Sequence, residues 1–552
     1  MGIGGREGLN PSCGRRGIPV SIRQGHPAAG AGGGIREKLS ALLVRSRPIR
    51  IFSPLRLTAL AAAAITLAAA TSAQAAPEPQ PGEFKAGETV SRVACLAAPE
   101  KTYALYLPTS YDPVKEPGRK WPVLYLFDAR GQGLMPLGLF REAAERFSTI
   151  LVSSNDTRSD IPFAPNLAAI QALVADSHRR FALDTARRYA AGFSGGGRMA
   201  AMLAFILKGS LAGSISCGAG YAENYPPRKE MPVPFYGTIG DEDFNFLEMQ
   251  LLERTLTSLS VPHRITVFSG PHRWPDASLC ADALEWMQVQ AARAGLIAKT
   301  DGVLDDRLAR ERRQEAELRQ TGQLLAADRR LEAIVRDFDG LRDVAAEKAA
   351  LAAAVRSSAH KKLAAEEDAL MKRERQVLAR QETLLQSALA EEAPAARLVR
   401  DLGIGELKQS ALEKDRSAEG KLASRALASL IARTSDLTGD FLEKKQPARA
   451  ALCLSVGVEI RPQNSFTWYN LACAQAIAGQ RARALTSLTR ATELGLPRGA
   501  DIEGDPDLAS LRTEPAYRDA LARLKAARDA AGMRDAAPAP TAAPAAAPAA
   551  VP

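Results

Sequence analysis

A short glycine-rich segment, Gly192-Phe193-Ser194-Gly195-Gly196, constrains the fold of this chain more than any other part of its sequence. It follows an apolar run at 189–191 and precedes a helix-like stretch at 197–207. A Gly-x-Ser-x-Gly motif between a strand and a helix forms a sharp turn that holds the serine strained and exposed, which requires small neighbours. The helix that begins there directs its first amides at any oxyanion formed at Ser194. Ser194 is therefore a candidate nucleophile.

The composition is that of a globular protein with several domains. With 552 residues the chain is too long for one ordinary hydrophobic core, and its apolar content of 46% and charged content of 24% are typical of folded proteins. The formal net charge is +10, but basic residues are mixed with Glu and Asp in the middle of the chain. No basic stretch is interleaved with stacking aromatic residues, so we expect no nucleic-acid partner.

The region 47–75 has the pattern of a secretory signal. Basic residues precede an apolar run at 57–70, and Ala73-Gln74-Ala75 forms a small-x-small cleavage site. The run is short and rich in alanine, so we expect no stable membrane span after cleavage. The preceding segment, 1–46, is either disordered or the product of a wrongly assigned start codon. The sequence therefore predicts a secreted or periplasmic protein.

From residue 84 to residue 298, short β-rich runs alternate with helical ones, which predicts a largely parallel sheet covered by helices on both faces. The first two runs predict an opening hairpin, and a continuous apolar run at 123–127 predicts a buried central strand. The expected strands are 90–94, 102–108, 123–127, 149–155, 189–191, 212–217, 233–236 and 264–268. The expected helices are 166–180, 244–258 and 277–294.

Four segments of this region resemble motifs of the α/β-hydrolase fold, and within it of exported esterases related to polyhydroxybutyrate depolymerases and feruloyl or acetyl-xylan esterases. They are YALYLP at 103–108, GFSGGG at 192–197, GDED at 240–243 and GPHRWP at 270–275. The resemblance covers only residues 84–298. It implies a serine hydrolase of the carboxylesterase kind.

The chain contains five histidines, and one of them is placed to activate Ser194. A serine hydroxyl needs a histidine to accept its proton and usually a carboxylate to orient that histidine. The resembling fold supplies them in the chain order serine, acid, histidine, each from a loop at the carboxyl end of a strand. His272 follows the last predicted strand within a Gly/Pro loop, and we take it as the general base. The other histidines lie before the signal, upstream of Ser194, before the last strand and in the charged helices: His26, His178, His263 and His360.

The acid is expected in the segment Gly240-Asp241-Glu242-Asp243. In the resembling family it commonly stands three residues after a glycine, which gives Asp243 from Gly240, and Asp241 is the alternative. Glu242, between them, should point away. The carboxylate that is not used should cap the helix that is expected from Phe244.

Two backbone N–H groups are expected to form an oxyanion hole. One belongs to Gly195, directly after the nucleophile, and the other to the loop that follows the strand 123–127. Enzymes of the resembling family often carry His-Gly in that loop, where this chain has Asp128-Ala129. We take Arg130 as the second donor, with Ala129 as the alternative.

The six cysteines follow no metal-binding spacing, so we expect neither a metal ion nor another cofactor. Three of them, Cys95, Cys217 and Cys280, fall in the proposed hydrolase region. One pair could be bridged in an exported protein, or all three could be small buried side chains.

The remainder of the chain is predicted to be helical. Region 301–440 has apolar residues at spacings of three and four, which predicts long amphipathic helices packed as an antiparallel hairpin or bundle, in the manner of a coiled coil. In region 441–530 a shift of 34 residues aligns Ala448 with Ala482, which is typical of tetratricopeptide (TPR) repeats. Such repeats often bind a protein partner, and a purely structural role is the alternative. Region 536–552 is Ala/Pro-rich and expected to be disordered.

Two functional hypotheses follow. In the first, Ser194, His272 and Asp243 cleave carboxylic esters of a small molecule or a polymer through an acyl-enzyme. In the second, the hydrolase fold is inactive and the TPR-like region recruits a partner, while a serine peptidase on the same fold is a further alternative. Irregular loops are expected to shape the substrate pocket: 128–140, 161–166 and 221–228.

Overall fold

The computed structural model describes residues 83–207, 210–300, 302–413, 417–496 and 502–530. The segment 1–46, the predicted signal at 47–75 and the predicted disordered tail at 536–552 lie outside these residues. None of the described helices is both long enough and apolar enough to cross a lipid bilayer.

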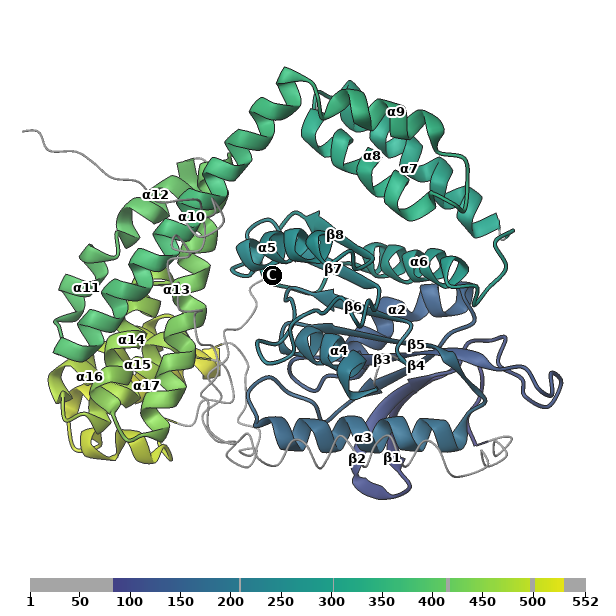
Figure 1. Ribbon diagram of the computed structural model, residues 1–552. Helices are drawn as coiled ribbons and strands as arrows, with labels where there is room; N and C mark the ends of the chain where they lie inside the picture. Colours follow the sequence, from purple (N-terminus) through teal and green to yellow (C-terminus); the bar gives the residue numbers. More distant parts are fainter. Residues whose placement is uncertain (1–82, 208–209, 301, 414–416, 497–501, 531–552) are drawn as a thin grey trace, which may run out of the picture. The chain divides into compact units, whose positions relative to one another are not determined.

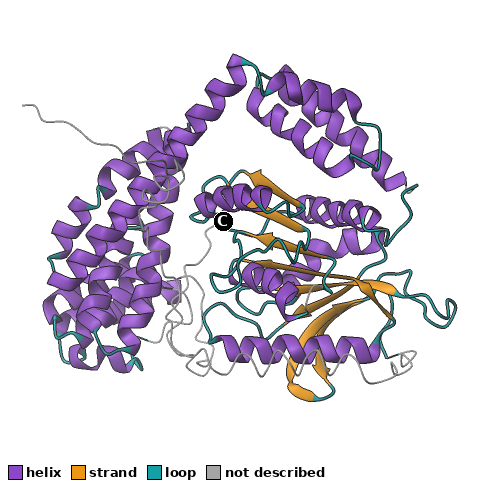
Figure 2. Ribbon diagram, in the orientation of Figure 1, coloured by secondary structure: helices purple, strands orange, loops and turns teal. Residues whose placement is uncertain are grey.

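An eight-stranded sheet organises the first part of the described chain (Figures 1 and 2). Its strand order is β1-β2-β4-β3-β5-β6-β7-β8. β1 and β2 form the predicted hairpin, β2 also pairs antiparallel with β4, and β3 to β8 are parallel to one another. The predicted mostly parallel sheet of an α/β fold is confirmed. The strands are β1 (Thr89–Cys95), β2 (Ala98–Tyr106), β3 (Trp121–Phe127), β4 (Ile150–Ser154), β5 (Leu183–Phe193), β6 (Gly213–Cys217), β7 (Phe235–Gly240) and β8 (His263–Phe268).

Helices cover both faces of this sheet because the strands are apolar on both faces. Every residue of β3 is buried, as predicted for a central strand. Tyr125 and Phe127 pack in the core under α3 and α4, whereas Leu124 and Leu126 pack in the core under α2 and α6. α5 covers the end of the sheet at β7 and β8. The helices are α2 (Leu134–Arg146), α3 (Phe163–Arg180), α4 (Gly195–Ile206), α5 (Phe246–Ser258) and α6 (Ala277–Arg293).

The rest of the described chain is helical, as predicted, whereas its TPR-like character stays a prediction. The longest helices are α10, with 34 residues, and α13, with 26 residues. Ala448 and Ala482, which the 34-residue shift aligns, lie in the first turns of α14 and α16. The helices are α7 (Gly302–Gln320), α8 (Leu324–Phe338), α9 (Ala345–Ala354), α10 (Ser358–Glu391), α11 (Ala395–Asp401), α12 (Ile404–Glu413), α13 (Ala418–Glu443), α14 (Pro447–Ile460), α15 (Ser465–Ile477), α16 (Arg481–Glu493), the 3₁₀ helix η1 (Pro506–Leu511) and α17 (Pro515–Ala530).

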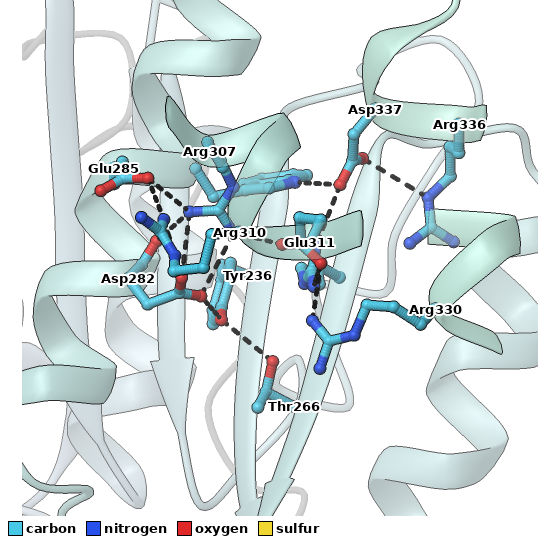
Figure 3. A network of polar contacts seen from close by, with 12 residues as sticks. Tyr236, Thr266, Asp282, Glu285, Arg307, Arg310, Glu311, Arg330, Arg336 and Asp337 are labelled. Atoms are coloured by element: carbon cyan, nitrogen blue, oxygen red, sulfur yellow. Dashed lines mark hydrogen bonds and ion pairs between the residues drawn. The ribbon is translucent and has the colours of Figure 1, made fainter. Parts of the chain in front are cut away.

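A buried ionic network connects the sheet to the first of these helices (Figure 3). Arg264 of β8 donates to Glu311 of α7 at 2.8 Å and to Asp337 of α8 at 3.1 Å. The indole N–H of Trp286, on α6, donates to the same Asp337 oxygen at 2.9 Å. α7 and α8 are therefore fixed to the edge of the sheet by interactions that are shielded from water.

One expected loop is largely a helix. The segment 128–140 was expected to be irregular, but α2 begins at Leu134 and buries Leu137 and Phe140 against the sheet. The helix begins after Gly133 without a side-chain cap, so its start carries no capping signal in the sequence. Similarly, α3 begins at Phe163, within the expected loop 161–166. The irregular part near Ser194 is therefore shorter than predicted.

Strand β7 extends to Gly240, whereas 233–236 was predicted, because two glycines obscured its second half. Gly237 packs closely under α5, and a Cβ at this position would lie 2.6 Å from Cε of Met249. The main chain at Gly240 lies against Gly270, and a Cβ there would collide with the Gly270 carbonyl. These glycines bring the loops after β7 and β8 into backbone contact.

Candidate active site

Ser194 occupies the sharp turn between β5 and α4, with φ of 56° and ψ of −121°. Non-glycine residues rarely adopt this conformation, which costs about 1–3 kcal/mol and must be held by its surroundings. The glycines on either side are required: a Cβ on Gly192 would collide with the Gly196 carbonyl, and one on Gly196 with the Phe127 carbonyl. The strand, sharp turn and helix expected from the sequence around Ser194 are thus present.

The main chain around Ser194 is held by β6 and by the start of α4. The Ser194 N–H donates to the carbonyl of Cys217, the last residue of β6, at 2.8 Å. Gly195 is the first residue of α4, so its N–H belongs to the positive end of the helix dipole. Gly195 is therefore suitably placed for its predicted part in an oxyanion hole.

His272 and Asp243, which lie on the loops after β8 and β7, form a direct pair. His272 Nδ1 lies 2.8 Å from Asp243 Oδ2. The carboxylate is fully buried, and its Oδ1 accepts the N–H of Asn245 at 2.8 Å. Since Nδ1 faces the carboxylate, Nε2 is the ring nitrogen that remains to exchange a proton with a serine.

The His272 ring lies beside the elbow. Its centroid is 4.6 Å from that of Phe193, the residue before Ser194, and 4.3 Å from that of Phe244. Gly218 approaches the same ring so closely that a Cβ there would lie 3.1 Å from His272 Cε1. Within the described residues Ser194 Oγ has no hydrogen bond, and bonds of this type often tighten only when substrate is bound. The serine, histidine and acid thus gather at one edge of the sheet.

Asp241 has a different role from the one expected of the unused carboxylate. It does not cap α5, whose N-cap residue is Asn245 with no side-chain hydrogen bond. Instead Asp241 Oδ1 accepts the N–H of Gly270 at 2.9 Å, and Oδ2 pairs with Lys421 Nζ at 2.5 Å. The expectation of a cap was wrong because a charged partner far away in the sequence competes for this carboxylate.

The loop after β3 is held by Asp128. Its Oδ1 accepts the N–H of Arg130 at 2.8 Å, and its Oδ2 accepts the indole N–H of Trp274 at 2.9 Å. The Arg130 N–H, predicted as the second oxyanion donor, is therefore engaged with a carboxylate in this structure. The second donor stays a prediction, with Ala129 as its alternative.

Sequence reasoning missed two residues that support the pair. Asn245 donates its N–H to Asp243, and its side-chain amide donates to the Gly218 carbonyl at 2.8 Å. Trp274, two residues after His272, is buried and donates its indole N–H to Asp128. Asn245 contacts Gly218 and Trp274 contacts Asp128, and no local pattern in the sequence indicates either contact.

The other described histidines do not join the site. Burial, together with the nearby Arg188, lowers the pKa of His178 to about 4. Burial, together with Arg336, lowers the pKa of His263 to about 4. His360 pairs with Asp328 in the helical region at 2.8 Å. His26 lies outside the described residues.

Cysteine and carboxylate side chains gather at one place in the described chain, far along the sequence from Ser194. Cys473, Asp505 and Asp507 present ligand atoms within 4.8 Å of one another. Burial and the two carboxylates raise the pKa of the Cys473 thiol. The five described cysteines are free and buried: Cys95, Cys217, Cys280, Cys453 and Cys473.

No protein-family model and no curated protein matches the chain. Among solved structures, it is similar to an S-formylglutathione hydrolase (FrmB) from Staphylococcus aureus, with 13% identity, 36% of this chain and 97% of that chain covered, and a TM-score of 0.29. A ferulic acid esterase has 16% identity, coverage of 38% and 99%, and a TM-score of 0.31. Est1E from Butyrivibrio proteoclasticus has 13% identity, coverage of 36% and 98%, and a TM-score of 0.29. At such values, the function has to be argued from the site itself.

Proposed function

We propose that this protein is an exported serine hydrolase that cleaves carboxylic esters through an acyl-enzyme. The observation that carries the proposal is the buried pair of Asp243 and His272, 2.8 Å apart, beside the strained turn at Ser194. Strain of this kind persists only where the surrounding structure maintains it, and it is common at functional sites. With Nδ1 facing the Asp243 carboxylate, the neutral His272 ring would serve the strained serine as a proton acceptor through Nε2.

In the proposed reaction, His272 Nε2 takes the proton of Ser194 as Oγ bonds to the ester carbonyl carbon. The Gly195 N–H, with a second donor at Arg130 or Ala129, stabilises the oxyanion. The bond from carbon to the alcohol oxygen then breaks, and His272 returns the proton to the departing alcohol. Water attacks the acyl-enzyme in the same way, and the acid is released as Ser194 regains its proton. Asp243 orients the ring and stabilises its charged form throughout.

The decisive experiment combines turnover of a short p-nitrophenyl ester with labelling of the purified full chain by a fluorophosphonate probe. We expect measurable hydrolysis and one label, located on Ser194 by peptide mass spectrometry. In Ser194→Ala turnover should fall by roughly 10⁶-fold, as in other hydrolases that lose the nucleophile. Labelling that persists in Ser194→Ala, or a wild-type chain without either activity, would contradict the proposal.

Ester specificity and export can be tested separately. Parallel assays on an aryl ester, a polyester film and a peptide would distinguish a small-ester hydrolase, a polymer esterase and a peptidase.

Export is supported by the signal-like pattern at 47–75. We expect the mature amino terminus at Ala76, which terminal sequencing of the exported protein would reveal. Protein retained in the cytoplasm with its leader intact would contradict export.

A further inference from the structure

The loop that carries the proposed acid and the loop that carries the proposed base are joined by Asp241. Besides the bond from Gly270 N–H to Asp241 Oδ1, the Asp241 N–H donates to the Phe268 carbonyl at 2.9 Å. The Glu242 N–H donates to the Gly270 carbonyl at 3.0 Å. Gly270 is two residues before His272, and Asp241 is two residues before Asp243. A displacement of Asp241 would therefore alter the alignment of the pair.

Helix α13 of the helical region contacts Asp241, which joins the two loops, through two cations. Lys421 and Arg425 are four residues apart, which places them on the same face of the helix. Lys421 Nζ pairs with Asp241 Oδ2 at 2.5 Å, and an Arg425 guanidinium N–H donates to the Asp241 carbonyl at 2.7 Å. Asp241 is thus held by its side chain and by its main chain from the same helix.

Arg425 is itself rigidly held. Its side chain is 4% exposed and forms a bidentate pair, at 2.7 and 2.6 Å, with Glu374 of α10, which is 2% exposed. Its guanidinium also lies 4.3 Å from the ring centroid of Phe246, the first residue of α5. A planar guanidinium with two fixed hydrogen bonds keeps little freedom, so the third bond, to Asp241, has a defined direction.

We propose that α13 positions the catalytic pair: Lys421 and Arg425 are positioning residues that hold the Asp241 joint and so keep Asp243 aligned with His272. The helical region is then a working part of the hydrolase in addition to any role in binding a partner. This inference rests on the proposed function. We expect both cations to affect the rate of the chemical steps and not the binding of substrate. Neither of them contacts the serine, the acid or the base among the described residues, so they would act through Asp241.

The test compares kcat and KM of the full chain on a short p-nitrophenyl ester, with kcat expressed per site titrated by the fluorophosphonate. Lys421→Met should lower kcat by about ten-fold with little change in KM, because small misplacement of a reacting group reduces rate more than binding. Lys421→Arg, which keeps the cation, should retain most of kcat. Arg425→Lys, which keeps the charge and loses the bidentate geometry, should also lower kcat.

Arg433→Gln is the matched control. Arg433, also on α13, pairs with Glu382 of α10 at 2.9 and 3.1 Å, in the same way that Arg425 pairs with Glu374. It makes no contact with the acid loop among the described residues, so kcat should stay at the wild-type value.

Either of two results would overturn this inference and leave the proposed function intact. In the first, Lys421→Met and Arg425→Lys have the same kcat as Arg433→Gln. In the second, the two variants have a lower melting temperature and fewer titratable sites, while kcat per titrated site stays at the wild-type value. A wild-type chain with no turnover and no label on Ser194 would instead overturn the proposed function, and this inference with it. The two failures are therefore distinguishable.

Discussion

Asp241 and Asp243 lie two residues apart in the sequence but have different roles, because their surroundings differ. Asp243 is fully buried and meets His272, whereas Asp241 faces Lys421 and the Gly270 N–H. The first can orient an imidazole and stabilise its charge, and the second holds two loops together. Loss of each carboxylate should therefore have a different kinetic consequence.

At this scale we predict that Asp243→Asn lowers kcat by about 10⁴-fold, because an amide facing Nδ1 favours the wrong tautomer of His272. Asp241→Asn should lower kcat far less, since it weakens the joint between the loops without touching the imidazole. Steady-state kinetics on a p-nitrophenyl ester, with folding checked by circular dichroism, would measure both. A larger loss in Asp241→Asn than in Asp243→Asn would mean that the acid is wrongly assigned.

At the scale of elements, the contact of α7 with the sheet depends on paired buried charges. Glu311 of α7 lies among Arg264, Arg307 and Arg330, at 2.8, 3.3 and 2.7 Å (Figure 3). Burial opposes its ionisation, but the three arginines prevail and hold the pKa of Glu311 at about 2. Such a carboxylate cannot be removed without leaving buried cations uncompensated.

Glu311→Gln should accordingly reduce the free energy of unfolding by about 3–5 kcal/mol, the range found when one partner of a buried ion pair is removed. Urea denaturation followed by tryptophan fluorescence would measure the change, since Trp286 belongs to the same network. Glu315→Gln is the control on the same helix: Glu315 pairs with the partly exposed Arg319 and should matter by less than about 1 kcal/mol. Equal effects of the two changes would contradict a structural role for the network.

At the scale of the whole molecule, two buried histidines make stability depend on pH. Burial lowers the pKa of His178, on α3, and of His263, on β8, from 6.5 to about 4. Between these pH values the unfolded chain binds protons that the folded chain does not. The free energy of unfolding therefore falls as pH decreases from 6.5 towards 4, by up to about 1.4 kcal/mol per pH unit for each histidine.

His263→Asn should make this dependence shallower, because asparagine does not titrate and can replace the bond from Nδ1 to the Val261 carbonyl. Thermal melting from pH 7 to pH 4.5 would compare the variant with the wild-type chain. The melting temperature of the wild-type chain minus that of the variant should decrease as pH falls, because only the wild-type chain loses stability through His263. Parallel curves would show that His263 does not titrate in the folded chain as described.

The sequence by itself determined the elbow, the order of serine, acid and histidine, and the two halves of the fold. These features are local: Gly192 and Gly196 are required by the turn next to them, and strand and helix periods repeat over a few residues. The strands 123–127 and 264–268 were predicted closely for this reason. The start of α2 and the second half of β7 were missed, because the first has no cap and the second contains two glycines.

Only the tertiary structure decided which acid meets His272, what Asp241 does and how the Arg130 N–H is engaged. Asp241 and Lys421 are 180 residues apart, so no local pattern relates them. Asp243 and Asp241 have the same side chain and nearly the same place in the sequence. Burial and the charges that other elements bring to each position distinguish them, and these depend on the packing of the whole chain.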